Sequence, residues 1–255
     1  MSHPLWNLFQ ELQSDQYEWV DLSHSLNNDS PYWAGIPDGS VELSKTVFDW
    51  GNPMLECLIQ TFKFPGQFGT HIDFPGHFIK DAPLSEKFGV KHMLYPLVVI
   101  DISDKVRKDV HYAVTADDIK NFESKYGNIP DGAFVALNAG WAKNWPDMDK
   151  LSGIDEKGNE NAPGWSLEAL KYIYEVRNAA ANGHETLDTD ASAAAAAAED
   201  LACERYVLSK GKLQIEVLNN LDRIAPVGSL LFAAWPNIEK ATGLPVRVLA
   251  ITPKN

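Results

Sequence analysis

Three side chains that can bind a metal ion stand within seven residues of one another, in residues 67–77 (QFGTHIDFPGH). His71 and Asp73 are two residues apart, so in an extended segment their side chains point to the same face and can share one ion. The Pro-Gly pair that follows favours a turn that could bring His77 back toward the same point. Ligands of these types suit zinc, manganese or iron. The stretch therefore predicts a metal site, although a hydrogen-bonded His–Asp pair at a strand end would leave the same pattern.

The same stretch resembles the signature HxGTHxDxPxH of the kynurenine-formamidase-like cyclase family. This is a family of metal-dependent hydrolases that includes arylformamidases and isatin hydrolase. Every signature position after the first His matches. Three further segments are similar to family segments in the same order: Asp21–His24 to the DLSH entry strand, Gln214–Leu221 to the LE-N-L segment, and Pro245–Ile251 to the closing PxRxxA pattern. The resemblance implies a metal-dependent hydrolase and extends over much of the chain.

In that family the signature residues, with a Glu or Gln from the later segment, hold one or two divalent ions. Two positions of this chain depart from the family: Gln67 stands where the signature has its first His, and Glu204 stands about where kynurenine formamidases have a further His ligand. Gln67 can still offer a neutral oxygen and Glu204 a carboxylate, which would shift the preference from zinc toward manganese or magnesium. Loss of a second ion is the other possible outcome. The resemblance implies these ligands: His71, Asp73, His77 and Glu216.

Two other histidines are candidates for the site. His184 follows a predicted helix stop at Gly183, where family members have an active-site loop; the alternative is a polar lead-in to a helix with Asp190 as its N-cap. His24 lies close in sequence to Trp33, and the two could line a substrate pocket. A hydrogen bond at the end of a strand is the alternative role for His24.

The predicted function is hydrolysis of a small cyclic amide, lactone or arylformamide by metal-activated water. A divalent ion with an open position lowers the pKa of bound water to about 7 and polarises a carbonyl oxygen, so no protein nucleophile is required. The candidates for proton transfer are His77, Glu204 and His184. One alternative is a polyketide-type cyclase or dehydratase that uses the same metal to stabilise an enolate. The other is a metal-binding module without turnover, which Gln67 favours.

Strands and helices must position these residues. Nearly continuous apolar runs are typical of strands buried on both faces, and they predict a central sheet from residues 94–102, 133–137, 230–234 and 246–251. Partly alternating segments rich in β-branched and aromatic residues predict an antiparallel part at residues 17–23, 41–48 and 55–64.

The predicted helices cover residues 4–13, 115–126, 166–182 and 191–210. Thr115 and Asp118 form a candidate capping box, Gly183 suits the end of the third helix, and Gly211 suits the end of the last, which contains six consecutive alanines. Strands and helices thus alternate in the middle of the chain, and no repeat or linker divides it. We therefore expect one α/β domain over residues 1–255, with a mixed sheet flanked by helices, of the swivelling β/β/α type.

The amino-acid composition limits the kinds of partner that the protein could bind and the compartment in which we expect it. The 255 residues are 45% hydrophobic and 22% charged, which is typical of a globular protein, and the formal net charge of −13 disfavours nucleic acid and anionic membranes as partners. No apolar run is long enough to span a membrane, and the start lacks the pattern of a signal peptide. With two widely separated cysteines, Cys57 and Cys203, we expect a cytoplasmic protein whose partner is a small-molecule substrate.

The expected assembly is a homodimer or homotetramer. The family resemblance implies it, and the extended N-terminal segments are rich in Trp residues that one small core would not cover.

Overall fold

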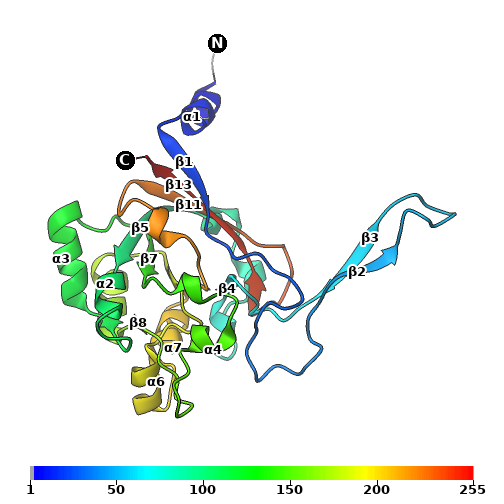
Figure 1. The fold of residues 1–255 in the computed structure, drawn as a ribbon. Coiled ribbons are helices and arrows are strands. Elements are labelled where there is room, and N and C mark those ends of the chain that lie inside the picture. Colours follow the sequence, from blue (N-terminus) through cyan, green and yellow to red (C-terminus); the bar gives the residue numbers. More distant parts are fainter. Residues whose placement is uncertain (1–2, 255) are drawn as a thin grey trace.

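Nine strands form the central sheet of the computed structural model, which describes residues 3–254 (Figure 1). Their order is β1-β13-β11-β5-β7-β9-β10-β4-β12; β5, β7, β9 and β10 run parallel, and the other neighbours pair antiparallel. The predicted class, α/β with a mixed sheet flanked by helices, is confirmed. Residues 1–2 and 255, the ends of the predicted domain, lie outside the described residues. The strand bounds are β1 Tyr17–Asp21, β4 His71–Asp73, β5 Leu94–Asp101, β7 Phe134–Asn138, β9 Ala181–His184, β10 Leu213–Glu216, β11 Ser229–Ala234, β12 Gly243–Pro245 and β13 Arg247–Pro253.

The apolar runs are buried because side chains of successive residues enter two different cores, one on each face of the sheet. In β5, Leu97 and Val99 belong to one core, and Val98 and Ile100 belong to the other. The second core lies under helices that each contribute buried apolar residues. These helices are α3 (Ala116–Tyr126), α5 (Leu167–Lys171) and α7 (Ala202–Ser209).

The remaining helices and short strands lie mainly in the connections. Thr115 caps α3 as predicted: its side chain accepts a hydrogen bond from Asp118 N, and the Asp118 carboxylate accepts one from Thr115 N. The other elements are α1 (Pro4–Leu12), α2 (Ser103–Val106), α4 (Met148–Ser152), α6 (Ser192–Ala198), β6 (Ala113–Val114), β8 (Gly164–Trp165), a π-helical turn (Tyr172–Val176) and 3-10 turns at Pro75–His77, Ser85–Lys87, Val90–Met93, Ala142–Asn144 and Leu221–Arg223.

Two elements extend away from the body of the molecule (Figure 1). The strands β2 (Glu42–Phe48) and β3 (Ile59–Lys63) form a separate antiparallel hairpin that projects to one side, and α1 projects from the edge of the sheet beyond β1. The predicted antiparallel segments are thus confirmed as strands, but only the first, β1, joins the central sheet.

The predicted helix at 166–182 is wrong in its second half. Ser166 caps α5 as a helix start should, but the helical turns end at Val176, and Asn178 has a left-handed φ of 52°. Residues 181–184 instead form β9, a central strand. Gly183 is therefore no helix stop: a Cβ there would lie 2.7 Å from Ile215 O and from the Phe134 ring, so the glycine permits close packing.

The predicted helix at 191–210 is two helices. Glu199 adopts a left-handed φ of 51° and separates α6 from α7. Asp190 is not the cap of the alanine helix, since Ala191 occupies that position. The Asp190 carboxylate instead accepts hydrogen bonds from Cys203 N and Glu204 N, at the start of α7. Among the described residues, no helix is long and apolar enough to cross a membrane.

Candidate metal centre

Four polar side chains form a block on one face of the sheet because of how β4 and β10 are paired. In this antiparallel pair Gln214 lies opposite Asp73, and Glu216 lies opposite His71. Residues two apart in a strand share a face, so all four side chains lie on the same side. The intervening Ile72 and Ile215 enter the opposite core. The block therefore faces the layer of α7, which packs against β10.

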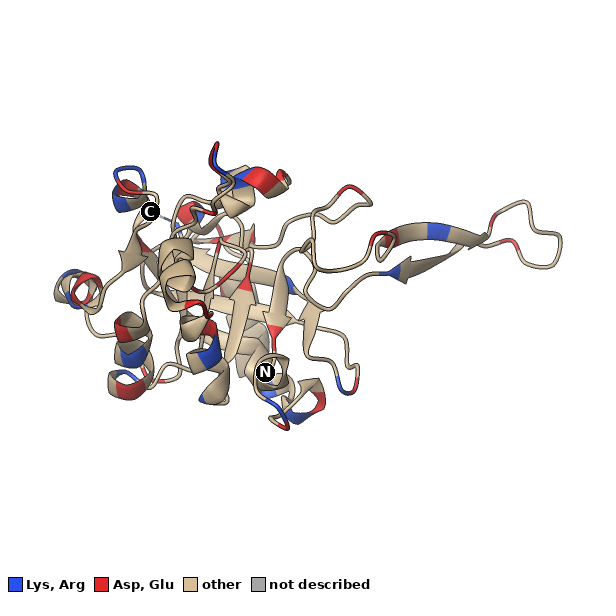
Figure 2. Ribbon diagram, turned by 90° about the horizontal axis from the view of Figure 1, so that it is seen from below, with Lys and Arg blue, Asp and Glu red and all other residues tan. Residues whose placement is uncertain are grey.

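Three of these residues could hold one metal ion. His71, Asp73 and Glu216 are buried, and one ligand atom from each lies within 4.8 Å of the others. His71 Nε2 is 3.3 Å from Glu216 Oε2 and 3.6 Å from Asp73 Oδ2. In Figure 2 the red of Asp and Glu appears on strands of the sheet as well as on the outer helices and loops. The structure thus brings together three of the four ligands that the sequence resemblance implies.

The contacts of the two ring nitrogens of His71 test whether His71, Asp73 and Glu216 fit a metal ion. Its Nδ1 lies 2.8 Å from the carbonyl oxygen of Gly69, so Nδ1 is the nitrogen that donates a hydrogen bond and Nε2 is the nitrogen that could bind a metal ion. That Nε2 is buried, has no hydrogen-bond partner and faces two carboxylates. A ring nitrogen and two carboxylates attract one another only when a proton or a cation lies between them. The three residues therefore fit a divalent ion.

The acidic groups are close enough to shift one another's pKa values. Burial, followed by the charge of Asp73, raises the pKa of Glu216 well above its ordinary value. Burial and the charge of Glu216 do the same to the pKa of Glu204. Buried carboxylates that gather without a compensating cation are costly, which again favours a positive ion among them.

Gln67 lies beside this group and contacts Asp73. Its Nε2 donates a 3.1 Å hydrogen bond to Asp73 Oδ1. Gly243 of β12 is paired with Asp73 on the other side of β4, and a Cβ at this glycine would lie 2.1 Å from Gln67 Nε2. The absence of a side chain at residue 243 therefore makes room for the Gln67 amide.

His77 is next to Glu204 and is not within the compact three-residue group. The 3-10 turn Pro75–His77 brings its Nε2 to 3.9 Å from Glu204 Oε1. Burial is the main cause that lowers the pKa of His77, but its side chain remains 29% exposed. His77 is thus a partly accessible base beside a buried carboxylate.

His184 lies at the end of β9 and is fully enclosed. Its Nε2 is 3.5 Å from Glu216 Oε1 and 3.3 Å from Thr189 Oγ1, and its Nδ1 lies 2.9 Å from the Thr186 hydroxyl. Burial lowers its pKa to about 3, so the ring is neutral near pH 7. His184 therefore contacts the site from the neighbouring strand, although no active-site loop carries it.

The predicted pocket residues His24 and Trp33 have different surroundings in the structure. His24 stacks on Trp145 with ring centroids 4.7 Å apart, whereas Trp33 is 69% exposed. Burial lowers the pKa of His24 to about 4. The Trp145 ring is close to Gly69, since a Cβ at that glycine would lie 3.6 Å from it. The aromatic residue near the candidate centre is therefore Trp145, which the sequence pattern did not single out.

Two further polar residues of the centre were missed from the sequence. Gln214 Nε2 lies 3.0 Å from Glu216 Oε1 and 3.3 Å from Asp73 Oδ2, and Thr189 Oγ1 donates a 2.8 Å hydrogen bond to Gln214 Oε1. One signal for Gln214 was available, because it is two residues before Glu216 and shares its face of the strand. No local pattern marks Thr189.

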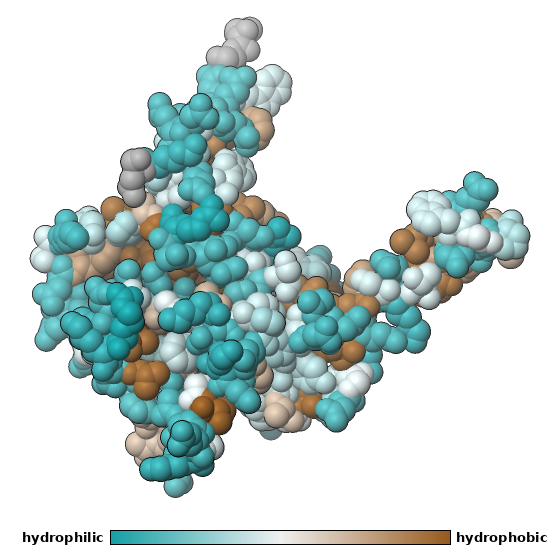
Figure 3. Space-filling model, viewed as in Figure 1, coloured by the Kyte–Doolittle hydropathy of each residue, from teal (hydrophilic) through white to brown (hydrophobic). Residues whose placement is uncertain are grey.

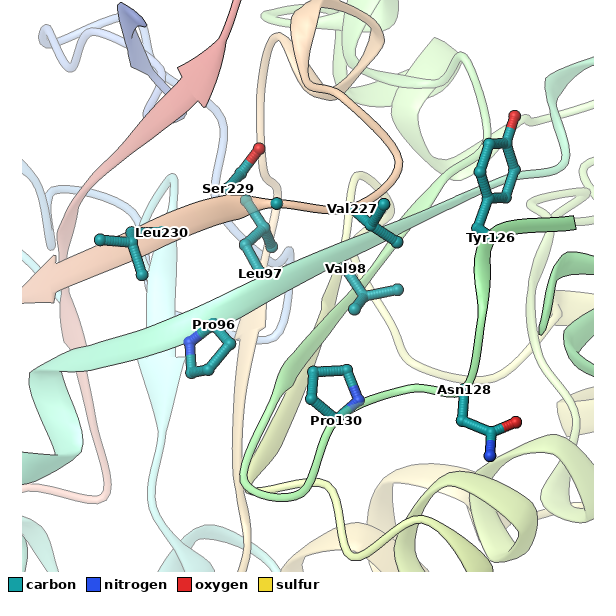
Figure 4. Close-up of a pocket in the computed structure, with 10 residues that line it drawn as sticks. Pro96, Leu97, Val98, Tyr126, Asn128, Pro130, Val227, Ser229 and Leu230 are labelled. Atoms are coloured by element: carbon teal, nitrogen blue, oxygen red, sulfur yellow. The ribbon is translucent and has the colours of Figure 1, made fainter. Parts of the chain in front are cut away.

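A cavity away from the candidate metal centre has different chemistry. It has a volume of about 380 Å³ and contains no histidine or carboxylate among its lining residues (Figure 4). Its walls come from β5, from residues at the start of β11 and from the segment after α3. The lining residues are Pro96, Leu97, Val98, Tyr126, Asn128, Pro130, Val227, Gly228, Ser229 and Leu230.

Comparison with known proteins gives similarity over nearly the whole chain. The isatin hydrolase of Roseibium aggregatum is 31% identical over 96% of this chain and 95% of its own. A kynurenine formamidase of Bacillus thuringiensis is 32% identical over 87 residues, which are 34% of this chain and 40% of that protein. The crystal structure of an isatin hydrolase bound to the product analogue thioisatinate superposes with a TM-score of 0.87 and 28% identity, over all of both chains.

A family model describes the same relationship. The Cyclase model, whose description is "Putative cyclase", matches residues 20–191, about two thirds of the chain. The range matched by the family model includes β4 with His71 and Asp73. The similarity to isatin hydrolase covers nearly the whole chain and so also includes the segment of Glu216. This chain belongs to the Cyclase family.

Proposed function

We propose that this protein is a metal-dependent hydrolase that cleaves the C–N bond of a small cyclic amide or an arylformamide. The observation that carries the proposal is the buried group of His71, Asp73 and Glu216, in which the imidazole Nε2 faces two carboxylates without a hydrogen-bond partner. Similarity to isatin hydrolase over nearly the whole chain supports the cyclic amide, and the shorter match to kynurenine formamidase supports the arylformamide. We propose that residues 1–255 act as one domain.

In this proposal His71, Asp73 and Glu216 hold one divalent ion, and Gln67 lies at its edge. A divalent ion at this centre would act as a Lewis acid that lowers the pKa of water and polarises the substrate carbonyl. Two carboxylates and one imidazole make a set rich in oxygen, which suits manganese better than a set with several histidines would. Zinc or manganese is therefore the proposed ion, and manganese is favoured.

Proton transfer is assigned to His77 together with Glu204. Hydrolysis adds the hydroxyl of water to the carbonyl carbon and a proton to the leaving nitrogen, so a group must take up and return one proton. His77 is partly exposed and lies 3.9 Å from Glu204, whose raised pKa allows it to carry a proton. His184, which the sequence predicts as a third group for proton transfer, is completely buried, and its contacts favour a different role, which is to hold Glu216 and Thr189 in place.

The substrate side of the centre is proposed to include His24 and Trp145. Their stacked rings lie beside Gly69, whose carbonyl oxygen contacts His71. A flat aromatic substrate would pack against such a surface. Trp33 would line the substrate pocket only if a second subunit covers its exposed ring.

The proposed assembly is a homodimer or homotetramer in the cytoplasm. The hairpin β2–β3 and α1 both carry exposed apolar side chains, and Figure 3 shows brown patches along the projecting hairpin. Met54 is 90% exposed and Trp6 is 70% exposed, which is costly in water unless another chain covers them. The free thiols Cys57 and Cys203 agree with a reducing compartment.

The test is metal analysis of the purified protein followed by activity assays on isatin, an N-formylated aniline and a lactone. We expect about one divalent ion per chain and hydrolysis of isatin or the formanilide, with one oxygen-18 atom from labelled water in the carboxylate product. Ring closure or dehydration without incorporation would instead support the cyclase alternative. A metal-loaded protein that turns over none of the panel would contradict the proposed substrate class.

A further inference from the structure

Gln214 connects the two carboxylates of the proposed metal site. The side chain belongs to β10, is fully buried and lies directly opposite Asp73 in the strand pairing. Its single amide nitrogen contacts one carboxylate on each strand, Asp73 Oδ2 at 3.3 Å and Glu216 Oε1 at 3.0 Å. Among the groups of this centre it is the one hydrogen-bond donor shared by both acids.

The orientation of this amide follows from its surroundings. The NH₂ end of Gln214 faces Asp73 Oδ2 and Glu216 Oε1, and carboxylates that bind a cation can only accept hydrogen bonds, so this orientation suits a site that holds an ion. The other end, Oε1, accepts a 2.8 Å hydrogen bond from the hydroxyl of Thr189. A rotation of the amide by 180° would place its oxygen against the two carboxylates, so these acids set the direction in which Gln214 donates. Thr189 holds the opposite end of the amide, and its hydroxyl also lies 3.5 Å from Glu216 Oε1.

Gln214 leaves one oxygen of Glu216 free for an ion, while both oxygens of Asp73 accept a hydrogen bond. Gln214 contacts Oε1 of Glu216, while Oε2 of the same carboxylate is the atom 3.3 Å from His71 Nε2. Asp73 is held on both sides, because Gln67 donates to its Oδ1 and Gln214 donates to its Oδ2. A neutral amide can thus hold two like charges in place without adding a competing cation.

We infer that Gln214 is a positioning residue that sets the divalent-metal affinity of this centre, with Thr189 fixing its amide. The inference rests on the proposed metal site. Without Gln214, Asp73 and Glu216 would each lose a donor that holds them in position, so part of the binding free energy would be spent on ordering the two carboxylates around the ion.

The experiment measures Mn²⁺ affinity by competition with a chelator, for the wild type and for Gln214→Met. Methionine has a similar length and no amide, so it removes the donor with little change in volume. We expect affinity to fall about 10- to 100-fold, the range typical of groups that orient metal ligands. Thr189→Val, which keeps the shape and removes the hydroxyl, should weaken binding by a smaller factor.

The matched control is Asn182→Leu. Asn182 is a buried amide on the neighbouring strand β9, paired with Gln214, and it accepts a hydrogen bond from Tyr174 rather than contacting the acids. This variant should lose thermal stability but keep wild-type Mn²⁺ affinity, which separates a general loss of packing from a specific effect on the ion.

The outcomes are distinct. Wild-type affinity in folded Gln214→Met overturns the inference, as does an equal loss in Asn182→Leu. If Gln214→Met does not fold, Thr189→Val decides, and unchanged affinity in that variant overturns the inference. A wild-type protein that binds no Mn²⁺ or Zn²⁺ would instead overturn the proposed metal site itself.

Discussion

His71 and Glu216, 145 residues apart in the sequence, face one another across β4 and β10, with Nε2 and Oε2 3.3 Å apart. Because Nδ1 of His71 donates to the Gly69 carbonyl, Nε2 is the nitrogen that faces Glu216 and could bind a metal ion. The pair is therefore arranged for a cation between them, and this relationship is the basis of the first prediction.

Removal of the His71 imidazole should abolish metal binding. His71→Ala leaves two carboxylates without the nitrogen ligand, and we expect the purified variant to contain less than about a tenth of the wild-type metal. Elemental analysis after exhaustive dialysis measures this, with His92→Ala, a change at an exposed histidine, as control. Stoichiometric metal in the His71 variant would refute the assignment.

Restoring the family residue at position 67 should change how zinc binding depends on pH. If Gln67 contributes to the ion, Gln67→His should bind zinc more tightly at pH 7 and above, and its affinity should fall more steeply below pH 7. The added imidazole must lose a proton before it can bind, and its ordinary pKa is about 6.5.

Zinc titrations of both proteins at pH 5.5, 7 and 8 test this expectation. The hydrogen bond from Gln67 to Asp73 offers the other outcome, in which the residue only orients the carboxylate. Indistinguishable affinities at all three pH values would then exclude Gln67 as a ligand.

A charge on the projecting hairpin should dissociate the protein into monomers. Phe62 on β3 is 59% exposed, and Phe62→Lys would place an ammonium group in the proposed interface. Light scattering should give at least twice the 28.3 kDa chain mass for the wild type and the chain mass for the variant. Val176→Lys, at a 57% exposed residue outside the hairpin, should assemble as the wild type does. A monomeric wild type at micromolar concentration would contradict the assembly.

Glu123 should contribute stability that depends on pH. Its carboxylate accepts hydrogen bonds from Arg177 and Tyr172 and from the backbone N–H of Ile129. Burial acts to raise the pKa of Glu123, but these hydrogen bonds, with that from Arg177 the largest, lower it below the ordinary value of 4.5. A lowered pKa of an acid gives stability that is present above pH 4.5 and is lost as the pH falls through the folded-state pKa.

We therefore expect Glu123→Gln to reduce the free energy of unfolding by about 1.5–3 kcal/mol at pH 7. The difference between variant and wild type should shrink as the pH falls below about 4.5. Urea unfolding at pH 7, 5 and 3.5 measures it. A difference that is the same at all three values would show that the charge of Glu123 is not involved.

The sequence predicted those strands whose own residues are apolar enough to indicate burial on both faces. The runs that became β5 and β13 are apolar on both faces, and the capping box of α3 is formed by two residues three apart. The error at 166–182 arose because β9 is short and includes Asn182 and Gly183, whose types suit a helix end. Only its position between two parallel strands gives these residues a reason to be extended.

The candidate site was predictable to the extent that its residues are close in sequence. His71 and Asp73 share a face in any extended segment, whereas Glu216 could be added only through the family resemblance. Gln214 and Thr189 depend on how strands pair and on where a loop returns, which no local spacing encodes. The break at Glu199 was hidden in the same way, because residues 193–198 are all alanine and favour one continuous helix.

The position of β4 in the sheet also restricts when the centre can form during synthesis. Within residues 3–254 its sheet neighbours are β10 and β12, which end at residues 216 and 245. A ribosome that has made the first 200 residues has therefore produced His71 and Asp73 on a segment with neither neighbour beside it. Loading of the proposed ion should then follow the emergence of β10 at residues 213–216, and a nascent chain stalled before residue 213 should fail to retain it.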